Sequence, residues 1–488
     1  MPAGPLRRWL CAVASAALLG AGALPASATD GAGARREADG SVVRLDAVVG
    51  GAIRQGATPG AALAIGHAGG DVVIRTYGRT DWSKAAPAVT DSTLYDLASL
   101  TKVMAATPAA MLLLEQGRLE LDAPISRYLS WWPTTGDKGR ITVRDLLLHR
   151  AGFPAGEALR GFDREDRIRS IADRPLEYAP GRGTIYSDIS MVMLDAVIES
   201  VTGQRIDQFV TRNIFMPLEM RETRYTPLQP LDAGPFDLAR IAPTLKVGSG
   251  HIQGTPQDPT ARALDGISGN AGLFSSIRDV ARYAQLMLVG AEGMRTPLLS
   301  DSIIRLFATH TAGATRALGW DGPGASTIWG PYFSDASFGH TGYTGTSIWI
   351  DPARDVFVVL LTNRLDPSAA NQKHLALRRA VNALVQHHFA GNPRSRLDAL
   401  EVGAASLLEG LPSFVAAPAQ PERDSAAVLP EWLLPGKSSL APHAGAGLTL
   451  VLLLLLSSAV ALAHDPTMRC RVQALAARVR DAGPGTEG

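Results

Sequence analysis

A serine and a lysine stand three residues apart in the stretch YDLASLTK, residues 95–102, just before an apolar run. The chain has only six lysines among its 47 basic residues, so the amine of Lys102 is an unusual choice here. An amine, unlike a guanidinium, can lose its proton when it is desolvated or lies near another cation. On a helix, the i to i+3 spacing puts Lys102 beside Ser99. The pair therefore predicts a serine hydroxyl that a neighbouring lysine makes nucleophilic.

The apolar run VMAATPAAMLLLEQG, residues 103–117, predicts a helix that begins at this pair. Free N–H groups at that end would supply half of an oxyanion hole. Ser-x-x-Lys alone is a weak signal, because serine is a common N-cap and lysine a common helix residue. Two more motifs follow in order: Tyr186-Ser187-Asp188 after PGRGTI, and His340-Thr341-Gly342, which we place at the start of a C-terminal strand.

Strand patterns lie near both ends of the central region, and helix patterns lie between and around them. Residues 61–68 and 71–78 read as one hairpin, and 345–351 and 355–363 read as another. Amphipathic helices are expected in four segments, 41–56, 187–203, 276–290 and 374–390. These patterns predict an α+β fold in which both ends form one antiparallel sheet. The long middle is then an inserted, mostly helical lobe, and a site would form in the cleft between them.

Several other classes of chemistry are disfavoured by the residues present. The 47 basic and 46 acidic residues give a net charge of +1, so nothing indicates a nucleic-acid partner. The two cysteines, Cys11 and Cys470, lie near the ends, which excludes a thiol nucleophile or cysteine metal site between them. No HExxH pattern and no Gly-x-Ser-x-Gly elbow occurs. We expect no metal and no cofactor, and we interpret His149 as a buried structural histidine.

The amino-terminal residues 1–28 have the features of a signal peptide. Arg7 and Arg8 precede an apolar run from Trp9 to Leu24, and Ala26-Ser27-Ala28 fits a cleavage site with small residues. A retained membrane anchor is the alternative, but the run is short and ends in small residues. The catalytic candidate is then the domain formed by residues 29–390.

The carboxy-terminal part predicts a tether and a membrane anchor. Residues 391–443 form a linker rich in proline and alanine, and residues 444–463 are uncharged throughout. Twenty such residues match the thickness of a hydrocarbon core. Arginines follow in the tail 464–488, and positively charged flanks stay in the cytoplasm. The sequence therefore predicts a single-pass membrane protein whose catalytic domain lies on the periplasmic or extracellular side.

The three motifs, in this order, resemble those of the class C serine β-lactamases and of the DD-peptidases and penicillin-binding-protein-like esterases that share their fold. Supporting stretches are residues 141–154, 178–203, 270–288 and 338–364, and the resemblance covers about residues 42–389. It implies a β-lactamase/transpeptidase-like fold. It also implies catalysis through an acyl-enzyme.

The resemblance implies a role for each motif residue. Ser99 would attack a carbonyl, Lys102 would hold or take its proton, and Tyr186 would be the hydroxyl partner of this pair. Which of Lys102 and Tyr186 is the base stays open, because groups this close titrate as a unit. His340 would orient the leaving group or a substrate carboxylate.

The same resemblance implies the groups that bind substrate. The backbone N–H groups of Ser99 and Tyr343 would form the oxyanion hole, and Thr341 and Gly342 would bring the strand edge against the substrate. Asp188 departs from the family pattern, which has asparagine there. Its carboxylate could repel an anionic substrate or pair with Lys102.

We therefore expect a membrane-anchored, exported serine hydrolase that acts on cell-wall peptide in the manner of a D-Ala-D-Ala carboxypeptidase, or on related amides and esters. His340 in place of lysine resembles DD-peptidases and esterases more than efficient β-lactamases. A carboxylesterase or β-lactamase of the same fold is one alternative, and a non-hydrolytic penicillin-binding sensor is another. The sequence leaves the substrate, the export route and the oligomeric state open.

Overall fold

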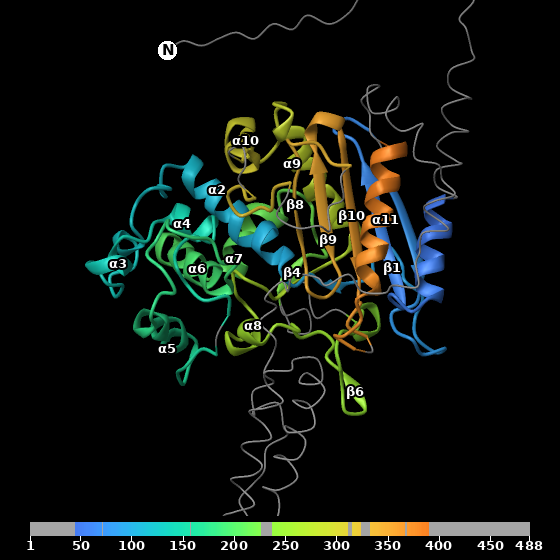
Figure 1. The fold of residues 1–488 in the computed structure, drawn as a ribbon, viewed down its shortest axis with the longest axis horizontal. Helices are drawn as coiled ribbons and strands as arrows, with labels where there is room; N and C mark the ends of the chain where they lie inside the picture. Colours follow the sequence, from blue (N-terminus) through green and yellow to red (C-terminus); the bar gives the residue numbers. More distant parts are fainter. Residues whose placement is uncertain are drawn as a thin grey trace, which may run out of the picture. The chain divides into compact units, whose positions relative to one another are not determined.

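The computed structural model of the chain describes residues 44–389, apart from 71, 157, 226–236, 311–314, 324–331 and 367. Its largest sheet has five strands in the order β2-β1-β10-β9-β8, each antiparallel to its neighbours (Figure 1). These strands are β1 (Gly60–Gly66), β2 (Val73–Gly78), β8 (Phe338–Thr341), β9 (Ser347–Asp351) and β10 (Val356–Thr362). The prediction that segments from both ends share one antiparallel sheet is confirmed.

Both faces of the central strands are buried, which explains why β1 carries no polar side chain and β10 carries only that of Thr362. On one face, Leu63 packs in a cluster with residues from the helical segment 44–54 and from α11 (Lys373–His388). On the other, Ala62 and Ala64 join the main core with α9 (Ile277–Ala291). Figure 1 shows α11 lying along the sheet. The sheet is thus a rigid layer between helices.

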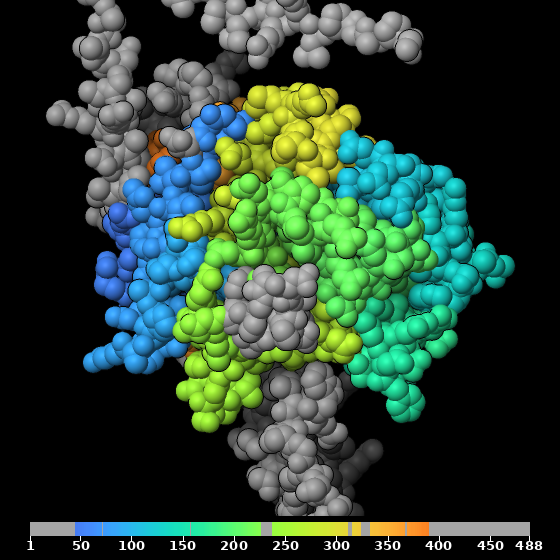
Figure 2. Space-filling view, turned by 180° about the vertical axis from the view of Figure 1, so that it is seen from behind, coloured from blue at the N-terminus to red at the C-terminus, as the bar shows by residue number. Residues whose placement is uncertain are grey.

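The segment between β2 and β8 forms the predicted helical lobe and a second, three-stranded sheet in the order β3-β7-β4. The longer helices of this segment are α2 (Thr107–Glu115), α5 (Arg164–Arg169), α6 (Asp188–Thr202), α9, and α10 (Asp301–Ala308). The shorter helices are α3 (Gly136–Gly139), α4 (Val143–Leu147), α7 (Ile206–Val210), α8 (Pro259–Ala263), η1 (Lys102–Ala106), η2 (Ile125–Arg127), η3 (Ser170–Asp173), η4 (Thr211–Phe215), η5 (Leu238–Arg240) and, beyond β9, η6 (Pro352–Arg354). The short strands are β3 (Tyr95–Asp96), β4 (Arg224–Tyr225), β7 (Leu273–Ser275) and the pair β5 (Lys246–Val247) and β6 (Gly250–His251). In Figure 2 the green part of this lobe, near residue 215 on the bar, is visible on the face opposite to that of Figure 1.

Helix α6 carries the second motif at its first turn. Ser187 is its N-cap, and the Ser187 hydroxyl accepts a hydrogen bond from the backbone N–H of Ser190. The helix ends at Gly203, whose φ of 68° is the left-handed value that glycine adopts without strain. Ten of its 15 residues are buried, so the helix is held firmly in the core. The position of Asp188 in its first turn is therefore fixed by the packing of the helix.

None of the described helices is long and apolar enough to cross a bilayer. The predicted signal peptide 1–28, linker 391–443, membrane span 444–463 and tail 464–488 lie outside the residues that the structure describes. Those four segments stay predictions from the sequence.

Candidate active site

Ser99 lies in a tight turn between β3 and the helix that follows. The residue before it, Ala98, has a φ of 45°, a left-handed value that costs a non-glycine residue about 1 kcal/mol or more. Asp96 holds this turn, because its Oδ1 accepts a hydrogen bond of 2.9 Å from the Ala98 N–H. Ser99 itself is partly exposed. The turn thus leaves Ser99 partly exposed between buried neighbours.

The predicted helix after Ser99 is present, but it opens with the π-helical turn η1. The N–H of Thr107 bonds to the carbonyl of Lys102, five residues earlier. Pro108 follows at once, and a proline has no N–H to donate to the carbonyl four residues before it, that of Met104. The proline is a local reason for the wider turn, and such turns are frequent at functional sites.

Lys102 is the centre of the site, and its side chain is fully buried. Its ammonium group donates three hydrogen bonds, to Ser99 Oγ (2.9 Å), Asp188 Oδ1 (2.7 Å) and the carbonyl oxygen of Asn270 (3.0 Å). Burial opposes the charge, but Asp188 and Tyr186 outweigh it and raise the pKa of Lys102. Lys102 is therefore an ammonium at neutral pH, and the predicted pairing with Asp188 is present.

Tyr186 lies among the other charged and aromatic groups of the site. Lys102 Nζ is 4.9 Å from the centre of its ring, and the ring of His149 is 4.7 Å away. The guanidinium of Arg316 is also 4.9 Å from the ring centre. Burial raises the pKa of Tyr186, while the nearby Lys102 ammonium acts in the opposite direction. The phenol is thus the protonated partner in the resting site.

His340 lies 5.8 Å from Tyr186 between ring centres, but not in the strand that we expected. It belongs to β8, a separate strand of four residues, and the expectation that His340-Thr341-Gly342 opens a strand is wrong. His340 and Thr341 instead end β8 and Gly342 follows it, because the chain turns between Gly342 and Gly345 before β9 begins.

One hydrogen bond and the burial of its ring fix the protonation state of His340. Its Nδ1 lies 2.8 Å from the carbonyl of Thr341, which can only accept, so Nδ1 carries the proton. Burial lowers the pKa of His340 to about 4, so the ring is neutral at pH 7. Its Nε2 is buried and has no hydrogen-bond partner among the described residues. The imidazole therefore has one acceptor without a partner, Nε2, and carries no positive charge.

The turn after β8 is locked against the segment that carries Ser99. Thr344 donates to the carbonyl of Asp96 (2.6 Å), and Thr346 donates to the carbonyl of Leu97 (3.0 Å). Gly342 has no space for a side chain, since a Cβ there would lie 2.1 Å from Thr346 Oγ1 and 2.5 Å from the Leu97 oxygen. The backbone of Tyr343 is thereby fixed beside the nucleophile segment.

Thr341 and Tyr343 lie on either side of Gly342. Thr341 is the last residue of β8 and pairs with Ser347 of β9. The Tyr343 side chain is exposed, and its ring centre lies 4.5 Å from the guanidinium of Arg364. The contacts given above join five of the predicted site residues: Ser99, Lys102, Tyr186, Asp188 and His340. The other three, Thr341, Gly342 and Tyr343, follow His340 directly in the chain.

Three residues of the site, Asn270, Arg316 and His149, were not predicted from the sequence to belong to it. Asn270 contacts Lys102 through its backbone carbonyl, which every residue type has, so no sequence signal exists. Arg316 forms an ion pair of 2.6 Å with Asp321 and lies outside every motif. His149 is buried, as we expected, but its ring also packs on Tyr186. Its Nδ1 accepts from the Ser187 N–H (3.0 Å), so a neutral ring must carry its proton on Nε2.

The described side chains contain no group of three or more His, Cys, Asp or Glu residues that could hold a metal ion. The site instead places a hydroxyl, an ammonium, a phenol and a neutral imidazole together. This set is suited to acyl transfer through a serine ester.

Comparison with known proteins agrees with this chemistry. The sequence model described as Beta-lactamase matches residues 45–383, and the chain belongs to the β-lactamase family. It is 35% identical over 315 residues to a putative D-alanyl-D-alanine carboxypeptidase of Escherichia coli O157:H7, covering 58% of this chain and 72% of that protein. It is 33% identical over 304 residues to an N-acetylmuramyl-L-alanine amidase of Bacillus subtilis (strain 168), covering 56% and 68%.

Solved structures give the same fold. EstCE1, a hydrolase with promiscuous acyltransferase activity, is 26% identical with a TM-score of 0.57, covering 71% of this chain and 99% of that one. A class C β-lactamase from Rhodobacter sphaeroides is 24% identical with a TM-score of 0.55, covering 70% and 99%, and supports the fold alone. The protein is thus a serine hydrolase with the β-lactamase/transpeptidase-like fold.

Proposed function

We propose that the protein hydrolyses amide bonds of cell-wall peptide through an acyl-enzyme on Ser99, in the manner of a D-Ala-D-Ala carboxypeptidase. The observation that carries the chemistry is the 2.9 Å contact between Lys102 Nζ and Ser99 Oγ, held by Asp188 on the other side. The substrate class is supported by the relatives, which are named as a putative D-alanyl-D-alanine carboxypeptidase and as an N-acetylmuramyl-L-alanine amidase.

In this mechanism the Ser99 oxygen bonds to the substrate carbonyl carbon as its proton leaves. The pair with Asp188 keeps the proton on Lys102, and the ammonium eases ionisation of Tyr186. We assign the phenolate of Tyr186 as the acceptor of the Ser99 proton, which it then donates to the leaving amine. Water attacks the resulting ester by the reverse path, so the hydroxyl of Ser99 is restored.

The backbone N–H groups of Ser99 and Tyr343 would bind the oxyanion. Their two segments are tied together by Thr344 and Thr346, which gives the rigidity that such a site needs. His340 would act on the substrate indirectly, through its ring 5.8 Å from that of Tyr186, because its Nε2 is buried. Because the imidazole is neutral, we do not assign it a charge-based contact with a carboxylate.

We further propose that residues 1–28 export the chain and that residues 444–463 anchor it in the cell membrane. The catalytic domain, residues 29–390, then faces the periplasm or the cell exterior, where cell-wall peptide is found. This placement is supported by the sequence features described above. Protease treatment of intact and opened cells tests it, because only an outward-facing domain is cleaved before the membrane is opened.

A panel of substrates tests the proposed activity. The full-length protein is incubated with a D-Ala-D-Ala pentapeptide, an N-acetylmuramyl-L-alanine peptide, p-nitrophenyl acetate and a chromogenic β-lactam. We expect steady release of D-alanine that Ser99→Ala abolishes. Turnover of the ester alone would replace the proposal by a carboxylesterase; the likeness to EstCE1, a hydrolase with promiscuous acyltransferase activity, is consistent with this alternative. A stoichiometric burst without turnover would indicate a penicillin-binding sensor.

A further inference from the structure

The loop of residues 268–270 supplies the third partner of Lys102. Two of the three acceptors of the ammonium, Ser99 and Asp188, belong to the motifs, and the third is the backbone carbonyl of Asn270 at 3.0 Å. An ammonium with three acceptors has its direction set by all of them. If the Asn270 carbonyl moved, Lys102 Nζ would move relative to Ser99 Oγ.

This loop is bonded at each of its three residues. The Tyr225 hydroxyl donates to the carbonyl of Ser268 (3.0 Å), and the Gly269 N–H donates to Asp195 Oδ2 (3.1 Å). The Asn270 side chain donates to Asp258 Oδ1 (3.1 Å). Gly269 lies flat on α6, because a Cβ there would be 2.5 Å from the carbonyl of Met191 and 2.9 Å from the Asp195 Cβ.

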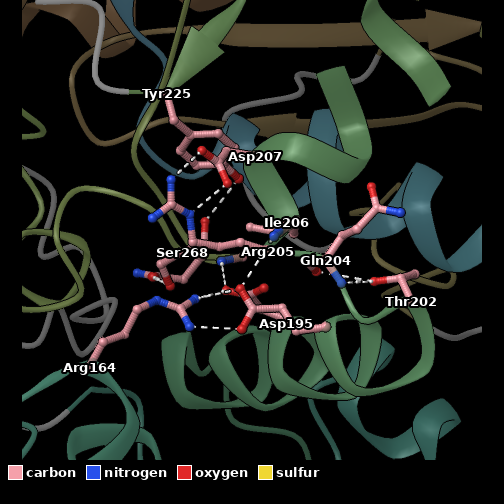
Figure 3. Close-up of polar contacts among 12 residues, drawn as sticks. Arg164, Asp195, Thr202, Gln204, Arg205, Ile206, Asp207, Tyr225 and Ser268 are labelled. Carbon is pink, nitrogen blue, oxygen red and sulfur yellow. Dashed lines mark hydrogen bonds and ion pairs between the residues drawn. The ribbon is translucent and has the colours of Figure 1, made fainter. Parts of the chain in front are cut away.

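Asp195 is the unusual member of this set. It lies on α6, two turns after Asp188, and its side chain is completely buried. Arg164 reaches its Oδ2 from α5 at 3.2 Å (Figure 3). The same guanidinium forms two hydrogen bonds of 2.8 Å with Glu199. The Oδ1 of Asp195 has no hydrogen-bond partner in the described part of the chain.

A buried carboxylate with one bare oxygen is destabilising relative to an apolar residue. Arg164 already has a bidentate carboxylate partner in Glu199, so the ion pair alone does not require Asp195. The contact that only Asp195 makes is the one with the Gly269 N–H, one residue before the carbonyl that holds Lys102.

We propose that Asp195 is a positioning residue: it holds the Gly269–Asn270 backbone on α6, so that the Asn270 carbonyl directs the Lys102 ammonium at Ser99. This inference rests on the proposed acyl-enzyme function of Ser99. Asp195 acts only through the loop, and substrate does not contact it. Its loss therefore slows acylation and leaves substrate binding unchanged.

The test measures the burst rate constant of the full-length protein over a range of p-nitrophenyl acetate concentrations, which gives its maximum and the dissociation constant Ks of the substrate. Asp195→Ala removes the acceptor and is expected to lower the maximal burst rate constant by about 100-fold at an unchanged Ks. Asp195→Asn keeps an oxygen that can accept from Gly269 and is expected to recover most of the rate. Glu199→Gln is the matched control, because it disturbs the same Arg164 and leaves the Gly269 bond intact.

The outcomes separate this inference from the proposed function. If folded Asp195→Ala keeps the wild-type burst, or if Glu199→Gln slows acylation equally, the positioning role is contradicted. Should Asp195→Ala fail to fold, Asp195→Leu decides, since it fills the same buried space without an acceptor for the Gly269 N–H and is expected to slow the burst as much; an unchanged burst overturns the proposal. A burst that persists in Ser99→Ala would instead contradict the acyl-enzyme function itself.

Discussion

At the scale of single residues, the negative charge of Asp188 influences the pKa values of the two candidate bases, Lys102 and Tyr186. Asp188 raises the pKa of Lys102, and it also raises the pKa of Tyr186. An amide at this position could accept the same hydrogen bond without the charge. The carboxylate thus keeps both candidate bases protonated to higher pH than an asparagine would.

Replacing Asp188 by asparagine is expected to move the pH dependence of kcat/KM to lower pH. In the wild type the rate should rise through the alkaline range, because the reactive form needs one of these groups deprotonated. Without the carboxylate the pKa of each group falls, so the rise occurs earlier whichever group is the base. The pH profile of p-nitrophenyl acetate hydrolysis measures this.

Asp122→Asn is the control, since Asp122 is an exposed carboxylate that pairs with Arg144 and contacts neither Lys102 nor Tyr186. Its profile on the alkaline side should match that of the wild type. If the pH profiles of kcat/KM for Asp188→Asn and the wild type coincide on the alkaline side, Asp188 has no influence on the pKa of the base.

His340 gives a second prediction at this scale. Burial lowers its pKa to about 4 from an ordinary value of 6.5, so its charge is constant between pH 5.5 and pH 8. We expect no inflection of kcat/KM near pH 6.5. An inflection there that disappears in His340→Asn would contradict the neutral assignment.

The motif residues could be predicted because they act through their side chains. Their motifs are also short, and they follow one another in the order of a known family. Ser99 and Lys102 are one turn apart, and Tyr186 and His340 were placed only by the resemblance. Asn270 could not be predicted, because it acts through a backbone carbonyl. Arg316 carried no signal either, since arginine is the usual cation of this chain.

At the scale of elements, the turn between β8 and β9 joins the two halves of the predicted oxyanion hole. The two hairpins were readable from β-branched and apolar runs, but β8 has only four residues and no such run. Its pairing with β9 is fixed by tertiary packing, which single-sequence patterns do not contain. Gly342 is the point of closest approach to the Leu97 carbonyl.

Gly342→Ala is expected to lower kcat by roughly 100-fold, the cost of losing one oxyanion donor. A Cβ cannot fit beside Thr346 and Leu97, so the turn must shift and carry the Tyr343 N–H with it. Gly69→Ala is the control, because a Cβ there meets nothing within 4 Å. Steady-state kinetics of both variants test the prediction, and a wild-type kcat for folded Gly342→Ala would contradict it.

At the scale of the whole molecule, several histidines are buried in neutral form. His374 is the clearest: its Nδ1 donates to the carbonyl of Asn371 (3.1 Å), and burial lowers its pKa to about 2. The unfolded chain takes up this proton as the pH falls below about 6.5, and the folded chain does not. The contribution of His374 to the free energy of unfolding is therefore lost progressively on acidification.

His374→Asn keeps a donor for Asn371 and removes the titration. Relative to this variant, the wild type is expected to lose about 1.4 kcal/mol of unfolding free energy per pH unit below about pH 6. Urea unfolding at pH 7, 6 and 5 measures the difference, in which the other histidines cancel. Parallel pH dependences for the two proteins would contradict a buried neutral His374.

The central claim is that Ser99 becomes covalently acylated. The most direct measurement is the intact mass of the full-length protein after mixing with a slowly hydrolysed acyl donor, followed by peptide mapping. We expect one acyl group, located on Ser99, and no mass increase for Ser99→Ala. An acyl group on another residue, or undiminished hydrolysis by Ser99→Ala, would contradict the account.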